Sequence, residues 1–296
     1  MRHIKSKVRL GAFAGALGVA LMATTSAFAI PTTIIAGIQV PTVMTPGGNF
    51  IASQLDFEKL VLAPGDTFFG IGQVTSISDA SATGTYAGFL GPTGGGFNIG
   101  IGSTSGLWGA FGGFIVDTIV GPTLSTAGKI TFTGGFLKYF TFPDGFPPVL
   151  TSGSSVVDFA NVMAGALWLS LLPDPIDALG HTLIITIPAA NSLSVFVGAS
   201  AQAALDVNLG DPAPANAFFH TCPIGGFVNP TGSLGCSDVR FIGSANSGAT
   251  LSGFDVSGTD SIKARSSTRI PEPGSLLLLG TGLLGLARFR RKRARA

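Results

Sequence analysis

Charged side chains are scarce in this chain, because Asp, Glu, Lys and Arg together make up 11% of its 296 residues. The sequence also holds just two cysteines and three histidines. Low charge combined with 23 phenylalanines excludes a typical disordered region, because such segments are highly charged and poor in aromatic residues. The sequence contains no H-E-x-x-H, no G-x-S-x-G and no G-x-x-x-x-G-K-[ST]. We therefore expect a folded protein without the motif of a zinc protease, an α/β-hydrolase or a P-loop NTPase.

The sequence has instead many short β-rich segments separated by Gly and Pro. Residues 67–77 and 136–142 are rich in Phe, Ile, Val and Thr, and residues 50–62 partly alternate between apolar and polar. Further candidate strands are 182–187, 193–197, 239–242, 251–256 and 261–264. This pattern predicts that residues 30–269 form a mainly β body, a single Gly-rich β-sandwich or jelly-roll-like domain. Residues 156–172 can form either a short helix or strands.

Residues 84–113 are dense in glycine, with Phe89, Phe97, Trp108 and Phe111 among the glycines. Glycine within strands marks bulges, bends or close approach of another backbone. Exposed aromatic side chains here would form a sugar-binding surface, whereas buried ones would fill the core of a loop-rich β region. We favour the core interpretation.

The two cysteines, Cys222 and Cys236, are 14 residues apart. In an exported protein such a pair predicts a disulfide, which would stabilise a loop of this length by about 3 kcal/mol. A metal site is not expected, because His220 is the one nearby histidine and the spacing matches no known zinc pattern.

The acidic residues between 30 and 269 are thirteen Asp and a single Glu, Glu58. Asp56 and Glu58 share one face of the predicted strand 50–62, and a glycosidase needs two such carboxylates beside a cleft. A solvated strand face explains this pair equally well. We expect His181 and His220 to cap strand edges or face solvent. The many aspartates leave a calcium role open, although no calcium loop of the form D-x-[DN]-x-[DN]-G occurs. We predict no catalytic residue, no specific metal site and no cofactor.

Residues 1–29 have the three parts of a secretory signal peptide. A basic start precedes the apolar residues 10–23, and a small-residue cleavage site of the A-x-A type follows. Signal peptidase is therefore an expected partner. The cleavage residues are Ala27 and Ala29, with Ile30 as the mature start.

The charge of the body differs from that of the whole chain. The chain is +2, but residues 30–269 contain seven Lys and Arg against fourteen Asp and Glu, a net charge of −7. An acidic body lacks the basic surface that nucleic-acid binding requires. We predict no nucleic-acid partner.

The last 27 residues combine three features in order. Pro271, Glu272 and Pro273 prevent a helix from passing through them. Residues 275–287 carry no charge and predict a short membrane span of about 20 Å, against about 30 Å of hydrocarbon. The tail 288–296 is basic and is expected to remain in the cytoplasm, which leaves the body on the other side. Its basic residues are Arg288, Arg290, Arg291, Lys292, Arg293 and Arg295.

A Pro-Glu-Pro triad, a short Leu/Gly-rich span and a terminal arginine cluster resemble the PEP-CTERM sorting domain over residues 270–296. The resemblance implies processing by an exosortase, a membrane protease and transpeptidase of exopolysaccharide-producing Gram-negative bacteria. It also implies transient membrane anchoring, followed by release or transfer to the cell surface or extracellular matrix. Residues 244–264 are loosely similar to flocculation-associated PEP-CTERM proteins. An ordinary C-terminal anchor is the alternative explanation of the same segment.

These observations predict an exported, non-enzymatic surface or matrix protein of a biofilm or floc, with exopolysaccharide as a candidate partner. The main alternative is a secreted carbohydrate-binding module or polysaccharide-active enzyme with the same sorting signal. A membrane-anchored sensor would require the tail to persist in the mature protein.

Overall fold

The computed structural model describes residues 32–35, 38–41, 50–60, 63–79, 106–142, 148–150, 153–222, 227–228, 236–249, 251 and 253–264. All of them belong to the second of two compact units, which begins at Thr32. The long strands are β3 (Phe50–Glu58), β4 (Thr67–Asp79), β5 (Gly106–Val120), β6 (Gly128–Phe142), β7 (Ala166–Asp174), β8 (Leu183–Ile187), β9 (Ala199–Val207), β12 (Val239–Ser247) and β13 (Val256–Ala264). Smaller elements are the hairpin β1 (Thr32–Ile35) and β2 (Ile38–Pro41), the ribbon β10 (Phe227–Val228) and β11 (Cys236–Ser237), and the helices α2 (Ser155–Met163) and α3 (Asn216–Phe219).

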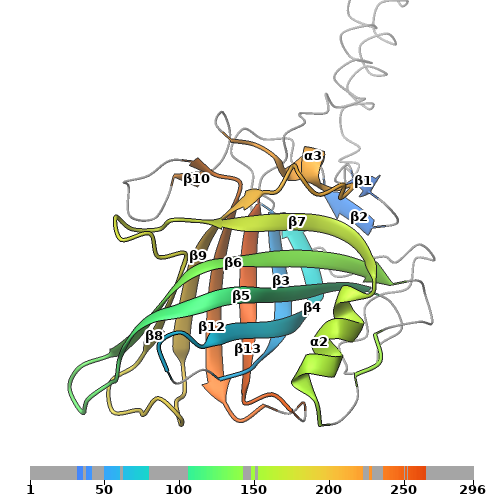
Figure 1. Cartoon of the computed structure of the whole chain (residues 1–296). Helices are drawn as coiled ribbons and strands as arrows, with labels where there is room; N and C mark the ends of the chain where they lie inside the picture. The colour runs from blue at the N-terminus through green and yellow to red at the C-terminus, as the bar shows by residue number, and fades with distance from the viewer. Residues whose placement is uncertain are drawn as a thin grey trace, which may run out of the picture. The chain divides into compact units, whose positions relative to one another are not determined.

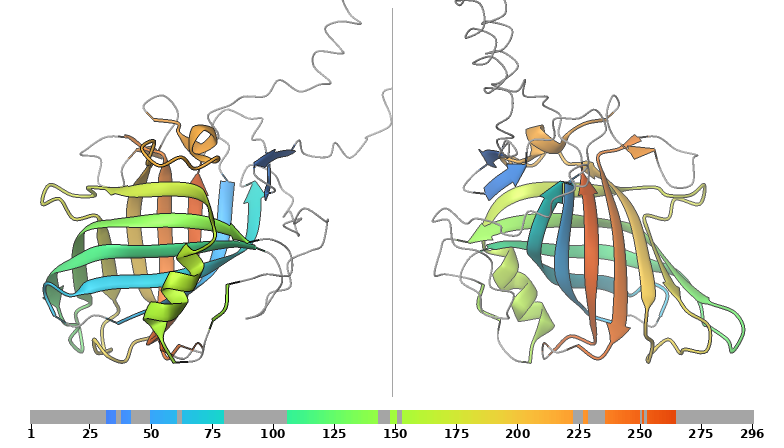
Figure 2. Two further views of the ribbon diagram at one scale, coloured as in Figure 1. Left: turned by 45° about the vertical axis from the view of Figure 1, so that its right-hand side comes forward. Right: turned by 180° about the vertical axis from the view of Figure 1, so that it is seen from behind.

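The nine long strands form one antiparallel sheet that closes on itself. Their order is β12-β13-β3-β4-β5-β6-β7-β9-β8, and β12 also pairs with β9. Both β7 and β8 lie between β6 and β9, and they share that position end to end. The result is a barrel-like sheet with eight strand positions. Figure 1 shows β4, β5 and β6 crossing the near wall, and Figure 2 shows β3, β13, β12 and β9 side by side in the far wall.

The prediction of a mainly β body is confirmed, but the structure has one closed sheet where a sandwich or jelly roll of two packed sheets was expected. Three strands are long, with 13 residues in β4 and 15 in each of β5 and β6. Register shifts interrupt the pairing at Phe68/Gly70, Val116/Thr118 and Tyr139/Phe140. Bulges of this kind bend a strand and increase its twist, so long bulged strands curl until the two ends of the sheet meet.

Side chains alternate between the interior of the closed sheet and its outer face. Several interior positions of β9 and β12 are Ala or Gly, while Phe68, Phe111 and Phe132 enter from β4, β5 and β6; Phe241 of β12 also faces the interior. These phenylalanines therefore face the alanines of β9 across the interior.

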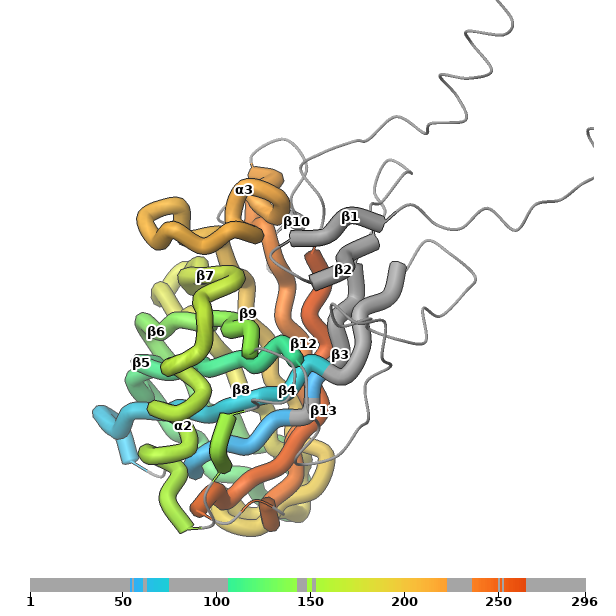
Figure 3. Tube along the Cα trace, turned by 90° about the vertical axis from the view of Figure 1, so that its right-hand side faces the viewer, coloured from blue at the N-terminus to red at the C-terminus, as the bar shows by residue number. Residues whose placement is uncertain are grey.

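Helix α2 covers part of the outer face. Its N-cap residue is Ser154, whose hydroxyl accepts a hydrogen bond from Val157 N at 3.4 Å and so caps the first turn. The ring of Phe159 packs edge-on against Phe69 at 5.4 Å and lies 6.4 Å from Phe136. Figure 3 shows the helix outside the sheet, beside β4 and β5. Residues 156–172 therefore include both of the expected structures, with α2 first and β7 after it.

Most predicted strands are present, and two are wrong. Residues 193–197 lie in the loop before β9, and of the predicted strand 251–256 the described residues 251 and 253–255 precede β13. In the glycine-dense segment, β5 begins at Gly106, and Trp108 and Phe111 are buried, as the core interpretation predicts. Phe89 and Phe97 lie outside the described residues.

Candidate functional site

The sequence-predicted sorting and cleavage residues lie outside the described part of the chain. This holds for the signal-peptide residues, the Pro-Glu-Pro triad, the span at 275–287 and the basic tail. Within the described residues no helix is long and apolar enough to cross a membrane. The structure therefore bears on the body, where the candidate site is a group of polar residues inside the closed sheet.

Asp56 and Glu58 share a face of β3, as predicted, but that face is the interior. Asp56 is 0% exposed and Glu58 is 6% exposed, so the interpretation of this pair as a solvated strand face is wrong. Gln54, two residues before Asp56, lies on the same face of β3 and is also buried. Asp260 joins them from β13, where it pairs directly with Gln54 and is 3% exposed. We call Gln54, Asp56, Glu58 and Asp260 the interior acid cluster.

Glycines on the neighbouring strands leave the room that these side chains occupy. Gly72 of β4 pairs with Asp56, and Gly243 of β12 pairs with Asp260. A Cβ atom added at Gly72 would overlap Asp56 Oδ1, and one added at Gly243 would overlap Asp260 Oδ1. The two carboxyl groups therefore lie against the backbone of Gly72 and Gly243, where any larger side chain would overlap them.

Hydrogen bonds link part of the cluster to β6 on the opposite wall of the sheet. Tyr139 of β6 donates from its hydroxyl to Gln54 Oε1 at 2.9 Å, and Gln54 Nε2 donates to Asp260 Oδ2 at 3.4 Å. Tyr139 reaches across Gly109, its partner residue in β5. Both carboxyl oxygens of Asp56 are buried, and they interact with the side chains of Asp260 and Gln54 in contacts that fall short of good hydrogen-bond geometry.

Burial favours the protonated form of the three carboxyl groups in the cluster. It raises the pKa of Glu58 to about 8, with a further contribution from the charge of Asp260, and raises the pKa of Asp260 to about 6. The pKa of Asp56 is raised by burial and then by Asp260, and that of Tyr139 by burial and then by the two aspartates. None of the Lys and Arg residues that the structure describes is buried. No basic side chain therefore neutralises these carboxyls.

Two small cavities border Glu58 inside the sheet, each of about 20 Å³. One is lined by Phe68, Phe111 and Phe114 and the small residues of β9, and the other extends toward Phe196 and Asp260. A volume of this size holds about one water molecule. A sugar ring does not fit in either.

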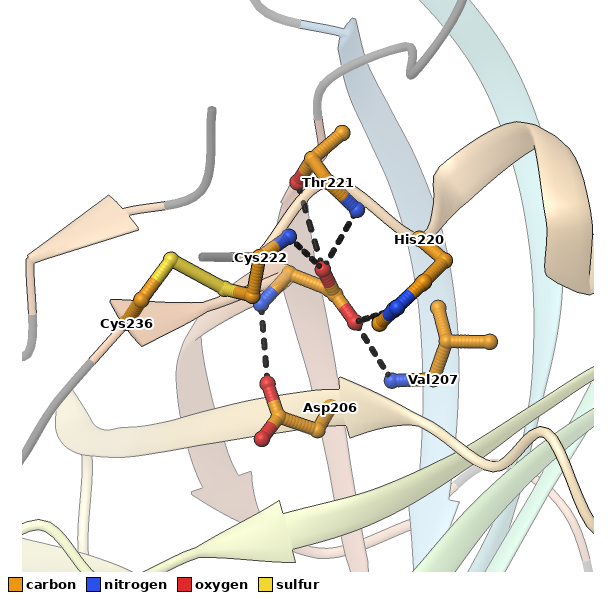
Figure 4. The surroundings of a disulfide bond; sticks show 7 residues. Asp206, Val207, His220, Thr221, Cys222 and Cys236 are labelled. Atoms are coloured by element: carbon orange, nitrogen blue, oxygen red, sulfur yellow. Dashed lines mark hydrogen bonds and ion pairs between the residues drawn. A yellow bond between two sulfur atoms is a disulfide. The ribbon is translucent and has the colours of Figure 1, made fainter. Parts of the chain in front are cut away.

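A second polar group lies around the disulfide, which is present between Cys222 and Cys236 as predicted. Beside it, the buried carboxylate of Asp238 accepts hydrogen bonds from the backbone N–H groups of Val207, Thr221 and Cys222 at 2.9, 2.6 and 2.7 Å. The Thr221 hydroxyl and His220 Nδ1 contact the same carboxylate at 3.2 and 3.1 Å. Figure 4 shows these donors converging from β9 and from residues 220–222.

Asp238 fixes the segment that carries the disulfide. Burial acts to raise its pKa, but the hydrogen bonds from Val207, Cys222 and Thr221 outweigh burial and hold the pKa below its usual value. Atoms of Asp206, Asp238 and Cys222 come within 4.8 Å of one another. Because the Cys222 sulfur is in the disulfide and Asp238 already has its donors, this group is poorly suited to a metal ion.

We expected His181 to cap a strand edge or to face solvent; it lies just before β8 and is buried, so the second of these alternatives is wrong. Its Nδ1 lies 2.6 Å from Asp177 Oδ2, and its Nε2 lies 3.0 Å from Asp117 Oδ2. Burial lowers its pKa, but the two carboxylates outweigh burial and raise it above the ordinary value. The imidazole therefore ties the loop before β8 to β5. His220 follows α3 directly, so it lies at a helix end and not at a strand edge, and it is partly exposed and contacts Asp238.

Comparison with known families identifies the end of the chain. The family model of the PEP-CTERM protein-sorting motif matches residues 269–292. The chain therefore carries a PEP-CTERM sorting motif. The PEP-CTERM motif implies export and sorting by an exosortase to the cell surface of a Gram-negative bacterium. The match does not include residues 244–264, so the similarity to flocculation-associated proteins stays a prediction. Comparisons with curated proteins and with solved structures find no match.

Proposed function

We propose that this PEP-CTERM protein is a non-enzymatic component of the cell surface or of the exopolysaccharide matrix. The observation that carries the proposal is the position of the motif, which begins at residue 269, directly after a strand that ends at Ala264. That strand, β13, pairs along all nine of its residues with β12 on one side and β3 on the other. The four residues between strand and motif reach about 14 Å at most. The sorting event thus acts on a tether that is anchored in the closed sheet.

The location of the acids supports a non-enzymatic role. The carboxyls with strongly raised pKa values, Asp56 and Glu58, are inside the sheet, next to cavities with room for about one water molecule each. A polysaccharide chain needs an open cleft with two carboxyl groups about 5–9.5 Å apart. A polymer in solution has no route to a carboxyl that is 0% exposed.

The alternative function is a carbohydrate-binding module or polysaccharide-active enzyme. One observation supports this alternative function: the carboxyl groups of Asp174 and Asp206 lie next to each other and are partly exposed. Burial and the neighbouring carboxylate raise the pKa of Asp206 to about 6, and burial raises the pKa of Asp174. If hydrolysis occurs, these two carboxyls are the ones to replace first.

Two measurements test the proposal. The first is the intact mass of the secreted protein from a wild-type strain and from a strain without exosortase. We expect the wild-type product to lack the basic tail, and a mass that includes residues 288–296 would refute sorting and favour a retained anchor.

The second measurement is binding and hydrolysis by the secreted protein on a glycan array and on purified exopolysaccharide. We expect retention on the exopolysaccharide of the producing strain without release of sugars. Turnover of any polysaccharide that is lost in Asp206→Asn would overturn the non-enzymatic proposal. Asp66→Asn, which changes an exposed carboxylate in a turn, is the matched control.

A further inference from the structure

Helix α2 presents apolar side chains to solvent and buries its only charged one. Asp158 is 0% exposed and shares the buried side of the helix with Ser155 and Val162. We define the α2 face as the exposed residues on the other side, which are Val156, Val157, Ala160, Met163 and the C-cap residue Ala164. We propose that the α2 face is a contact surface between two copies of the protein, with α2 of one copy packed against α2 of the other.

The exposed residues form one continuous stripe. Positions 160, 163 and 164 follow position 156 by four, seven and eight residues, which places all four on the same side of a helix with 3.6 residues per turn. Val156 at one end of the stripe is 66% exposed, and Met163 near the other end is 37% exposed. A surface helix normally directs such a stripe at the protein core. Because the opposite side of α2 already covers the sheet, this stripe is left for a partner outside the chain.

The residues around the α2 face extend its apolar surface and add no charge. Val149 is 66% exposed and lies beside the helix, because its carbonyl oxygen accepts a hydrogen bond from Asn161 Nδ2 at 2.6 Å. Residues 148–166 include no Lys, Arg, Glu or His, and their one Asp is the buried Asp158. Their one aromatic ring before β7, that of Phe159, packs on the sheet. The surface therefore offers no charge for a phosphate group and no open ring for a sugar, and it fits another aliphatic surface.

The sheet holds the α2 face in a fixed position. The ring of Phe159 packs between Phe69 of β4 and Phe136 of β6, with ring centroids 5.4 and 6.4 Å away. Gly112 of β5 gives this ring its room, since a Cβ atom there would lie 3.2 Å from it. A rigid face loses little conformational entropy when a partner binds, so a small contact area can still produce association.

The shape of the stripe suits pairing with itself. Ala160 and Ala164 are one turn apart, and small side chains at this spacing let the backbones of two helices come close together. In a twofold contact the same patch serves both copies. With the twofold axis beside Ala160, this residue lies near its own counterpart whether the two helices run parallel or antiparallel.

The position of α2 allows two copies attached to one surface to make this contact. The helix packs on the middle of the wall formed by β4, β5 and β6, whereas Ala264 is at the end of the closed sheet where β13 finishes (Figures 2 and 3). A twofold axis that runs along this wall relates the two copies side by side. It leaves both Ala264 residues at the same end of the pair.

The size of the α2 face determines how strong the contact is. With Val149 included, its partly exposed side chains offer about 200–300 Å² of apolar surface. Stable complexes bury about 800 Å² per partner, so we expect a weak contact with a Kd of roughly 0.1–1 mM in solution. Copies held together at a cell surface reach effective concentrations on the order of 1 mM. That last step rests on the proposed function, whereas the contact itself does not.

The test is disulfide crosslinking between copies of the secreted protein at a concentration near this Kd. Ala160→Cys places a thiol at the centre of the α2 face, and Ser125→Cys, in the exposed loop between β5 and β6, is the matched control. We expect Ala160→Cys to form a covalent dimer at least about ten times faster, because its thiols are held together in the complex while those of the control meet by random collision. Equal rates for the two variants would overturn the proposal.

A charge on the α2 face should abolish the contact. Val156→Glu, added to Ala160→Cys, places like charges opposite each other and should slow crosslinking to the rate of the control. Glutamate in the first turn favours the helix, so the fold is retained. Leu179→Glu changes a residue that is 80% exposed in the loop before β8 and should leave the rate unchanged. Crosslinking that continues in Val156→Glu would show that the copies meet elsewhere and would refute the α2 contact.

Sedimentation equilibrium of the unsubstituted protein gives a second test that needs no variant. We expect the average mass to rise with concentration, and a monomer at concentrations well above the expected Kd would contradict the proposal. A monomer whose binding to exopolysaccharide or to phospholipid vesicles is lost in Val156→Glu would assign the face to that partner and equally overturn the self-contact. None of these results bears on sorting, which the intact mass of the secreted protein tests separately.

Discussion

Replacing Glu58 with Gln should make the stability of the protein less dependent on pH. Glu58 is buried inside the closed sheet, and burial raises its pKa from 4.5 to about 8. The folded state therefore keeps a proton that the unfolded chain releases above about pH 4.5. Stability from this group is fully present below pH 4.5 and is lost as the pH rises toward 8. Gln has the shape of protonated Glu and does not titrate, so the variant lacks this loss.

The size of the effect follows from proton linkage. Each proton that the folded state retains costs about 1.4 kcal/mol of stability per pH unit. Between pH 5 and pH 7.5 the wild-type protein should lose roughly 3 kcal/mol more than Glu58→Gln, given the pKa of about 8. Asp260 and Asp56 add to the wild-type loss and remain in the variant.

Urea unfolding followed by tryptophan fluorescence measures this difference. Trp108 and Trp168 are both 2% exposed, so both report on unfolding. The matched control is Asp255→Asn, which removes a partly exposed ion pair with Lys59 at 2.9 Å and should shift stability by less than about 1 kcal/mol at every pH. Parallel stability profiles of wild type and Glu58→Gln from pH 5 to pH 7.5 would show that Glu58 is ionised in the folded state and would refute the reasoning.

Three further predictions concern the glycine contacts, the Asp238 hydrogen bonds and the disulfide. Gly72→Ala should lower the unfolding free energy by about 1–3 kcal/mol because its Cβ overlaps a buried carboxyl, whereas Gly121→Ala, with one neighbouring atom at 3.9 Å, should be nearly neutral in the same urea titration. Asp238→Asn should cost about 2–4 kcal/mol, since it removes the charged acceptor of three backbone N–H groups, and a loss under 0.5 kcal/mol would contradict that role. Replacing Cys222 and Cys236 together by Ser should cost about 3 kcal/mol, measured against wild type in the absence of reductant; wild type with reductant should match the double variant.

The β class was predictable from composition and turns, but several strands were not. Strand β9 reads ASAQAALDV, and alanine has low strand propensity, so nothing in that segment alone indicates a strand. Its small side chains are needed because they face phenylalanines across the interior of the closed sheet. Strand β5 could not be predicted from its sequence because glycines interrupt its apolar pattern. In both strands tertiary packing overrides local preference.

Closure of the sheet was also beyond sequence reasoning. Alternation along β3 and β13 is the same whether a sheet stays open or curls, and the bulges that curl it have no distinct local pattern. The decisive pairing of β12 with β9 depends on the accumulated twist of all the strands between them.

Part of the candidate site could be predicted from the sequence. The two-residue spacing of Asp56 and Glu58 correctly predicts a shared face, but spacing cannot say whether that face meets solvent or core. Gln54 and Asp260, which contact each other inside the sheet, are 206 residues apart in the chain. The register that joins them is set by the pairing of β3 with β13. The disulfide was accessible to prediction because its chemistry depends on two residues alone.

The pairing of β13 also determines how the protein would respond to mechanical load. A protein held at the surface through the residues after Ala264 transmits drag from flowing water or from bound polymer into the end of this strand. Force along the strand axis loads its backbone hydrogen bonds to β12 and β3 in shear, all at once, whereas force across an edge strand would break them one at a time. Attachment next to β13 therefore places the tension on a strand whose hydrogen bonds on both sides share the load.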